Sequence, residues 1–312
     1  MRVYLTPPQP SRGLDRIAHA LRRYAPASVE VCEFPRNVDL TVIYAIGRRD
    51  HIERQCVDIW RQGKKYVIVQ VCLRSTMSPR VDDWLQASDV GLYSEGFEGI
   101  WLNSHVIWSY YDLDQACVDD GWSLEHDGDS MFDRDQFYHA PLGADPDVFY
   151  PRDMPKQYTI ATSGYNRLQE SIRECALAAG AVNGMVFHLG ETRNWYDNII
   201  YANGIDDLQL ATRYSMCQFV SGLRRTEGFE LPAVEGLLCG ARPIVFDTPD
   251  YRWNYREFAE YVHEGSRAEV VEQLVELFKR GARPVGDAEL AEARHWFNWE
   301  RICGEFWNRC LQ

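Results

Sequence analysis

The chain has 312 residues, enough for two domains of ordinary size, and its 46% hydrophobic and 25% charged residues are typical of a globular protein with a large core. No apolar run approaches the roughly 20 residues that a membrane-spanning helix needs, and Met1 leads directly into an expected strand without a signal-peptide pattern. The nine cysteines are scattered without Cys-x-x-Cys spacing, which indicates reduced thiols and a cytoplasmic setting.

The net charge of −13 is unevenly distributed along the chain. Residues 1–80 hold 14 Lys and Arg against 7 Asp and Glu, whereas residues 81–135 hold one Arg against 14 acidic residues. A basic segment beside an acidic one suggests a surface for a charged partner, although an ordinary solvated surface is the more common meaning of such a pattern.

The first part of the chain alternates between strand and helix patterns. Strands are expected at 2–6, 29–34, 38–46 and 66–73, and helices at 14–24 and 51–62. This alternation predicts a parallel sheet with helices on both faces, in which ligands bind at the carboxyl ends of the strands. Arg12 and Gly13 follow the first strand and are therefore placed to face such a site, although Gly13 could equally be a simple turn residue.

The helix expected at 14–24 is amphipathic. Its apolar face consists of Leu14, Ile17, Ala18, Leu21 and Tyr24, and its basic face consists of Arg16, His19, Arg22 and Arg23. The basic face has three readings that the sequence leaves open: a solvated surface, a contact with nucleic-acid phosphates, or a contact with a membrane surface.

Residues 81–135 are rich in Asp, Trp and Tyr, and their elements are harder to assign. The turns at 119–121 and 127–129 lack the spacing and the closing Glu of a calcium loop, so no metal site is expected. His105 and the acids Glu95 and Glu98 are the acceptor-side candidates of this half, with His105 the candidate catalytic residue, although a lone His is more often structural.

A Pro- and Gly-rich connector at 139–151 suits the boundary between two lobes. The second lobe opens with a strand at 158–164 that ends in Gly164, and Arg167 follows it closely. We therefore expect a first domain at 1–145, a second at 146–290, and a final helix at 291–312.

The stretch at 223–243 organises the second domain. A strand at 218–223 leads into a loop, Pro232 suits the first turn of a short helix, and Gly240 suits the position just past its end. A buried strand at 243–246 follows. The amides of Gly228, Phe229, Glu230 and Leu231, together with the positive helix end, would make an anion site.

This stretch resembles the signature of the family 4 glycosyltransferases, which are retaining enzymes of GT-B fold. The matching residues are Glu227-Gly228-Phe229-Glu230-Leu231, Glu235-Gly236, Gly240 and Pro243-Ile244-Val245, and Glu230 replaces the second glycine of the family. The connector at 139–151 and Trp296-Phe297-Asn298-Trp299-Glu300 resemble the interdomain segment and the closing helix of the same family. The chain is shorter than usual members, which raises the option of a compact bacteriophage-type enzyme.

The resemblance implies an α/β fold with two Rossmann-like domains facing across a cleft. It implies a nucleotide-diphosphate sugar as donor substrate, no cofactor and no metal. Glu235 would take the ribose hydroxyls, and Glu227 the transferred sugar, a hexose or pentose. The family's phosphate-binding Arg and Lys after Gly164 are displaced or missing here, so Arg167, Arg224 or Arg225 would hold the diphosphate.

Three questions stay open at this stage. The acceptor could be a glycan, a lipid, or a hydroxymethylated base in DNA. The chain could also be a catalytically silent nucleotide-sugar-binding protein, because Glu230 and the missing Arg/Lys pair depart from the family pattern. The structural alternative for the two acids is that Glu227 merely complements a helix start and that Glu235 is a surface residue.

Overall fold

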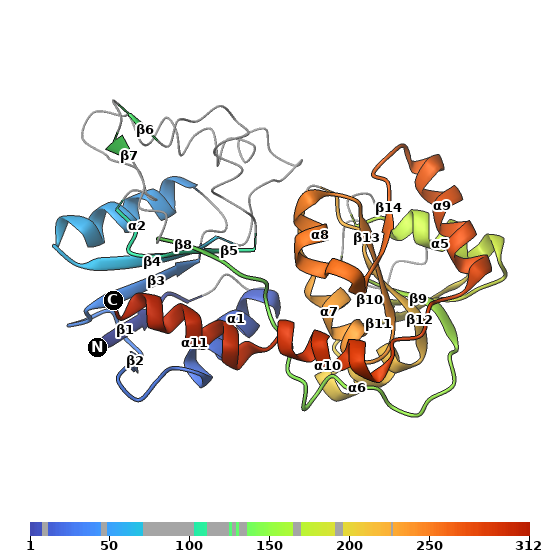
Figure 1. Ribbon diagram of the computed structural model, residues 1–312, viewed down its shortest axis with the longest axis horizontal. Coiled ribbons are helices and arrows are strands. Elements are labelled where there is room, and N and C mark those ends of the chain that lie inside the picture. The colour runs from blue at the N-terminus through green and yellow to red at the C-terminus, as the bar shows by residue number, and fades with distance from the viewer. Residues whose placement is uncertain are drawn as a thin grey trace. The chain divides into compact units, whose positions relative to one another are not determined.

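The computed structural model describes residues 1–7, 12–44, 49–70, 103–110, 125–126, 129–130, 136–164, 170–190, 196–225 and 227–312. Contacts divide the chain into two compact units, which Figure 1 shows with their elements labelled. The first unit contains residues 1–142 and 299–312, and the second contains residues 143–298. The chain therefore leaves the first unit once and returns to it with its last helix.

The first unit is built on a parallel sheet whose described strands are β2 (Glu30–Cys32), β1 (Arg2–Leu5), β3 (Leu40–Tyr44), β4 (Lys65–Gln70), β5 (Ile107–Ser109) and β8 (Phe137–His139), in spatial order. The strand order reverses between β1 and β3. All residues of β3 are buried, as expected for a parallel strand that is covered on both faces. A separate antiparallel pair is formed by β6 (Glu125–His126) and β7 (Asp129–Ser130).

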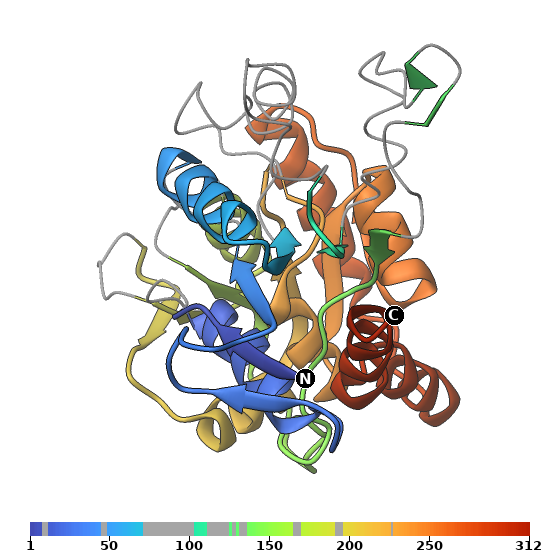
Figure 2. The same ribbon diagram turned by 90° about the vertical axis from the view of Figure 1, so that its left-hand side faces the viewer.

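Helices cover both faces of this sheet. The helices α1 (Arg12–Arg23) and α11 (Trp299–Cys310) lie on one face and α2 (Arg49–Arg61) lies on the other (Figures 1 and 2). The final helix is fastened by polar contacts, because Trp307 Nε1 donates to Leu21 O at 3.1 Å and Tyr138 Oη donates to Ile302 O at 2.9 Å. Its expected packing stripe is buried, namely Trp299, Ile302, Phe306 and Cys310.

The amphipathic pattern of α1 is confirmed. Leu14, Ile17, Ala18 and Leu21 are buried, whereas His19, Arg22 and Arg23 are exposed. Across the described residues, no helix is both long enough and apolar enough to cross a membrane.

The second unit contains another parallel sheet, with described strands in the order β11 (Ile199–Ala202), β10 (Val186–Leu189), β9 (Tyr158–Ser163), β12 (Cys217–Gly222), β13 (Arg242–Phe246) and β14 (Glu260–Val262). Numbered along the chain, this order is 3-2-1-4-5-6, that of a dinucleotide-binding Rossmann sheet. The expected α/β class is therefore confirmed for both units.

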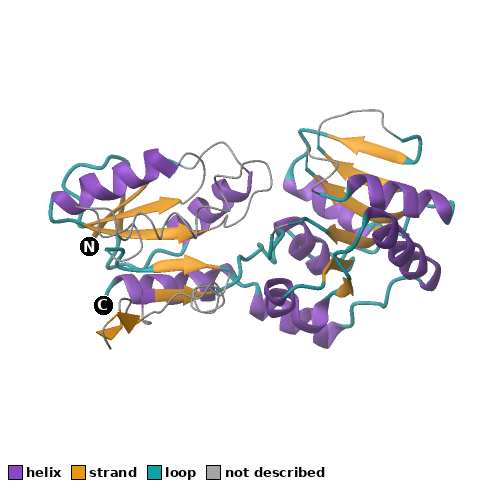
Figure 3. Ribbon diagram, turned by 90° about the horizontal axis from the view of Figure 1, so that it is seen from above, coloured by secondary structure: helices purple, strands orange, loops and turns teal. Residues whose placement is uncertain are grey.

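The helices of the second unit also lie on both faces of its sheet (Figure 3). On one face α5 (Ile172–Ala181) packs against α9 (Arg267–Arg280). On the other, α7 (Leu231–Leu238) contacts α6 (Asp207–Ser215) and α10 (Asp287–Trp296). Two of these helices begin with a capping box, formed by Asp206 with Gln209 and by Ser266 with Glu269. The remaining elements are α8 (Pro249–Tyr255) and a 3₁₀ turn, η2 (Arg256–Phe258).

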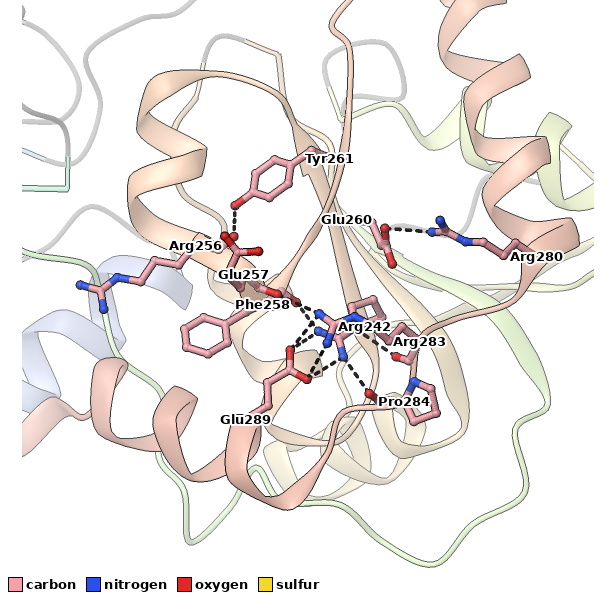
Figure 4. Close-up of polar contacts among 10 residues, drawn as sticks. All are labelled: Arg242, Arg256, Glu257, Phe258, Glu260, Tyr261, Arg280, Arg283, Pro284 and Glu289. Carbon is pink, nitrogen blue, oxygen red and sulfur yellow. Dashed lines mark hydrogen bonds and ion pairs between the residues drawn. The ribbon is translucent and has the colours of Figure 1, made fainter.

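A buried arginine at the start of β13 makes several polar contacts within the second unit. Arg242 opens β13 and is 1% exposed, and its guanidinium donates to the backbone oxygens of Phe258, Arg283 and Pro284 and to the carboxylate of Glu289 (Figure 4). The segment that joins α9 to α10 is thereby held against the start of β13.

Candidate functional site

The candidate site lies at the carboxyl ends of β9 and β12. These two strands are neighbours in the sheet, but the connections that follow them run in opposite directions, to β10 and to β13. In doubly wound sheets the loops at such a switch point separate and leave a crevice for a ligand. Gly164, just past the end of β9, and the described residues 223–225 and 227–230, which follow β12, lie at this switch point.

Two glycines lie close together just past the ends of β9 and β10. Gly164 has a φ of +107°, a conformation that residues with a Cβ rarely adopt, so glycine is favoured there. A Cβ on Gly190 would lie 2.3 Å from Gly164 O. Arg167 lies outside the described residues, so its part in the site stays a prediction.

His188 contacts Thr162 and Gly164 at the carboxyl end of β9, and the sequence pattern had not indicated this residue. Its Nδ1 lies 2.9 Å from Thr162 Oγ1, and the side chain is buried. Burial lowers the pKa of His188 to about 4, with a partial opposing effect from a hydrogen bond to Gly164. The imidazole is therefore neutral at neutral pH and serves as a packing and hydrogen-bonding group.

The strand-loop-helix at 217–246 has the predicted form. The helix α7 begins at Leu231 with Pro232 in its first turn, and Gly240 just past its end has a φ of +81°. Gly236 allows the helix to lie directly on β12, because a Cβ there would come within 2.6 Å of Val220 Cγ1. The glycine after Glu235 is thus required by packing.

Arg224 joins the two acids of the loop into one cluster. Its Nε lies 3.9 Å from Glu227 Oε1, and its Nη1 lies 3.3 Å from Glu230 Oε1. The side chains of Glu227 and Glu230 are only 9% and 14% exposed. Burial raises the pKa of Glu230, and the nearby Arg224 guanidinium opposes that shift only in part. The cluster combines two shielded carboxylates with one cation, an arrangement suited to binding hydroxyl groups.

Glu235 lies on the second turn of α7 and is 2% exposed. The alternative that Glu235 is a surface residue is therefore wrong. A carboxylate is rarely buried without a polar partner, so a structural or ligand-binding function is indicated. Its assignment to the donor ribose stays a prediction.

The neighbouring Arg225 is directed elsewhere. Its Nη1 lies 3.5 Å from Glu264 Oε1, its Nη2 donates to Gly265 O at 3.2 Å, and its guanidinium lies over the Phe246 ring. Arg225 thus tethers the loop to the segment after β14, whereas Arg224 stays with the two acids.

Of the expected loop amides, one is already used within the protein. The N–H of Glu230 donates to Tyr255 Oη at 3.0 Å, so it is not available to an anion, contrary to the expectation for all four amides. Glu230 is also the N-cap residue of α7, but its side chain makes no capping hydrogen bond. Any phosphate at this helix start would therefore be held by the remaining amides.

Two of the expected donor-site residues, Gly13 and Arg12, belong to α1 of the first unit. Gly13 lies in the first turn of α1, directly after the β1 loop and at the strand-order reversal of that sheet. Arg12 opens α1, but its side chain lies outside the described residues.

His105 lies just before the amino end of β5, the edge opposite the ligand-binding edge of a parallel sheet. Its Nε2 lies 3.2 Å from Cys310 O, and burial lowers its pKa. These surroundings indicate that His105 fastens α11, and they do not support a catalytic role. Glu95 and Glu98 lie outside the residues that the structure describes.

Among the described residues, no group of three or more His, Cys, Asp or Glu side chains is arranged to hold a metal ion.

No protein-family profile and no curated protein sequence matches the chain, whereas many solved structures do. HepE from Anabaena, solved in complex with UDP, is 11% identical over 98% of both chains, with a TM-score of 0.66. Sucrose-phosphate synthase from Thermosynechococcus elongatus is 15% identical over 89% of this chain and 75% of its own, with a TM-score of 0.63. WaaG, a glycosyltransferase of lipopolysaccharide biosynthesis, is 13% identical over 99% of this chain and 95% of its own, with a TM-score of 0.55.

These similarities extend over nearly the whole chain and include both units. Together with the two parallel sheets and their strand orders, they establish the architecture. The protein has the two-domain α/β fold known as GT-B.

Proposed function

We propose that this protein is a retaining glycosyltransferase that moves a hexosyl or pentosyl group from a nucleoside-diphosphate sugar to a hydroxyl acceptor. The observation that carries the proposal is the cluster of Arg224, Glu227 and Glu230 beside the start of α7, at the switch point of a Rossmann sheet. The GT-B fold, the sequence resemblance to family 4 enzymes and the UDP in the similar structure of HepE support it.

In this proposal each part of the donor has its own group of residues. Glu235 binds the ribose hydroxyls, since a carboxylate accepts two hydrogen bonds from a diol. Glu227 binds the hydroxyls of the transferred sugar. The amides of Gly228, Phe229 and Leu231 and the positive end of α7 hold the diphosphate and stabilise the charge that develops on it.

The transfer itself balances without a protein nucleophile. The bond between the sugar C1 and the β-phosphate oxygen breaks, and a new bond forms between C1 and the acceptor oxygen on the same face. The acceptor proton passes to the departing phosphate oxygen, and the nucleoside diphosphate is released. The resemblance to family 4 enzymes implies that no metal ion takes part in this step. Activity is therefore expected to be equal with and without EDTA.

We propose that the acceptor is a glycan or a lipid and that the protein acts in the cytoplasm. DNA containing hydroxymethylated bases is the second acceptor class, favoured by the exposed His19, Arg22 and Arg23 on α1. A compact family 4 enzyme of bacteriophage type would use that acceptor.

A second candidate function is that of a catalytically silent nucleotide-sugar-binding protein. This candidate is favoured by Arg224, because its guanidinium already pairs with the carboxylates of Glu227 and Glu230 within the protein. A panel of UDP- and GDP-sugars separates the two, with release of the nucleoside diphosphate as readout and with hydroxymethylated DNA, oligosaccharides or lipid vesicles added. We expect turnover with at least one donor and acceptor. Binding of a nucleotide without any turnover would support the silent protein instead.

A further inference from the structure

The loop between β12 and α7, which carries Glu227 and Glu230, is held by the short helix α8. Three side chains of α8 bond to the backbone of this loop, and all three are fully buried. Tyr251 Oη donates to Arg224 O at 3.1 Å, and Asn254 Nδ2 donates to Gly228 O at 2.9 Å. Tyr255 Oη accepts from the Glu230 N–H at 3.0 Å and donates to Glu230 O at 2.6 Å.

The Tyr255 hydroxyl bonds to the backbone of the N-cap residue of α7. Glu230 stands at the N-cap position of α7, where a Ser, Thr or Asp side chain would usually bond to the first amides. Instead, Tyr255 fixes both backbone groups of this residue and thereby the direction in which the loop enters the helix. Burial raises the pKa values of Tyr251 and Tyr255 well above the ordinary range, so both hydroxyls remain protonated donors.

The supporting helix is itself firmly held. Trp296 Nε1 donates to Asn254 O at 2.9 Å, and the Arg256 guanidinium lies 3.4 Å from the centre of the Trp296 ring. The Tyr255 ring is stacked on Phe229 at 5.7 Å and also contacts Phe297 at 6.0 Å. A rigid support of this kind is what precise placement of loop amides requires.

We propose that Tyr255, together with Asn254, is a positioning residue for the donor diphosphate. It sets the backbone of the loop so that its remaining amides meet the terminal phosphate of the bound nucleotide. This inference rests on the proposed function, because it assumes that a nucleoside diphosphate binds at the start of α7. Neither residue belongs to the part of the sequence that resembles the family signature.

The test compares Tyr255→Phe with Tyr138→Phe in the full-length protein. The control also removes a buried hydroxyl that donates to a backbone oxygen, Ile302 O at 2.9 Å, but in the first unit. Affinities for UDP and UMP are measured by calorimetry, with GDP and GMP as a second pair. Tyr255→Phe is expected to weaken binding of the diphosphate about tenfold, the effect of one charge-assisted hydrogen bond, and that of the monophosphate less than twofold.

A purely structural role would change the two affinities in parallel or not at all, and either result would overturn the inference. Hydrogen exchange of peptides covering 227–231 adds a readout without ligand, and it should be faster in Tyr255→Phe and unchanged in Tyr138→Phe. If Tyr255→Phe does not fold, Asn254→Ala removes the bond to Gly228 O without adding a charge and is judged by the same affinity ratio. Failure of the wild-type protein to bind either diphosphate would contradict the proposed function itself.

Discussion

The buried guanidinium of Arg242 donates two hydrogen bonds to the carboxylate of Glu289, which lies 47 residues further along the chain. Figure 4 shows that the same guanidinium also donates to the backbone oxygens of Phe258 and Pro284. The guanidinium of Arg283 donates to the same carboxylate. The pair therefore connects the start of a central strand to the start of α10.

Removing the carboxylate should be costly, because it leaves a buried cation without its counter-ion. We expect Glu289→Ala to lower the free energy of unfolding by about 3 kcal/mol, as for other buried pairs that lose one partner. Glu276→Ala is the matched control, since Glu276 pairs with Lys279 at 2.8 Å but both side chains are exposed. That control should change stability by less than about 1 kcal/mol in the same urea titration. Equal effects of the two substitutions would show that Arg242 is satisfied by backbone oxygens alone.

The same pair predicts a pH dependence. Burial alone would raise the pKa of the Glu289 carboxyl, but hydrogen bonds and charges from Arg242 and Arg283 outweigh it and lower the pKa below its usual value. A lowered pKa stabilises the folded state above the unfolded value of about 4.3, and this stability is lost as the pH falls through the folded value. The wild-type protein should therefore lose more stability than Glu289→Gln between pH 6 and pH 3, measured by thermal unfolding. Parallel curves of stability against pH for the wild-type protein and Glu289→Gln would contradict the lowered pKa of Glu289.

Two helical glycines should respond in opposite ways to the same substitution. Gly236→Ala places a methyl group 2.6 Å from Val220 Cγ1, so we expect a loss of about 1–3 kcal/mol from overpacking. Gly304 lies in α11 with nothing within 4 Å of an added Cβ, so Gly304→Ala should stabilise the protein by about 0.5–1 kcal/mol through its better helix propensity. Urea unfolding of both variants provides the measurement, and a gain in stability for Gly236→Ala would mean that α7 can move away from β12.

Substitutions of Glu235 and of Glu227 should have different effects on nucleotide affinity and on kcat. If Glu235 binds the donor ribose, Glu235→Ala should weaken nucleotide affinity tenfold or more, and full retention of affinity would refute that assignment. If Glu227 binds the transferred sugar, Glu227→Gln should reduce kcat with a donor sugar but leave the affinity for UDP within about twofold. Glu272→Gln, on an exposed turn of α9, is the control and should change neither quantity.

Local sequence patterns determined much of the second unit. Pro232 and Gly240 marked the limits of α7 because their backbone preferences act over one or two residues. The alternating strands and helices gave the α/β class for the same reason, since hydrophobic periodicity is local.

Tertiary structure decided what depends on distant partners. Tyr255 meets Glu230 across 25 residues, and His105 meets Cys310 across 205, so neither contact leaves a mark in the nearby sequence. The direction of Arg225 was likewise set by Glu264 and Gly265, which follow β14. Propensity and periodicity act along the chain, whereas the pairing of polar groups depends on which strands become neighbours, and only the folded sheet fixes that order.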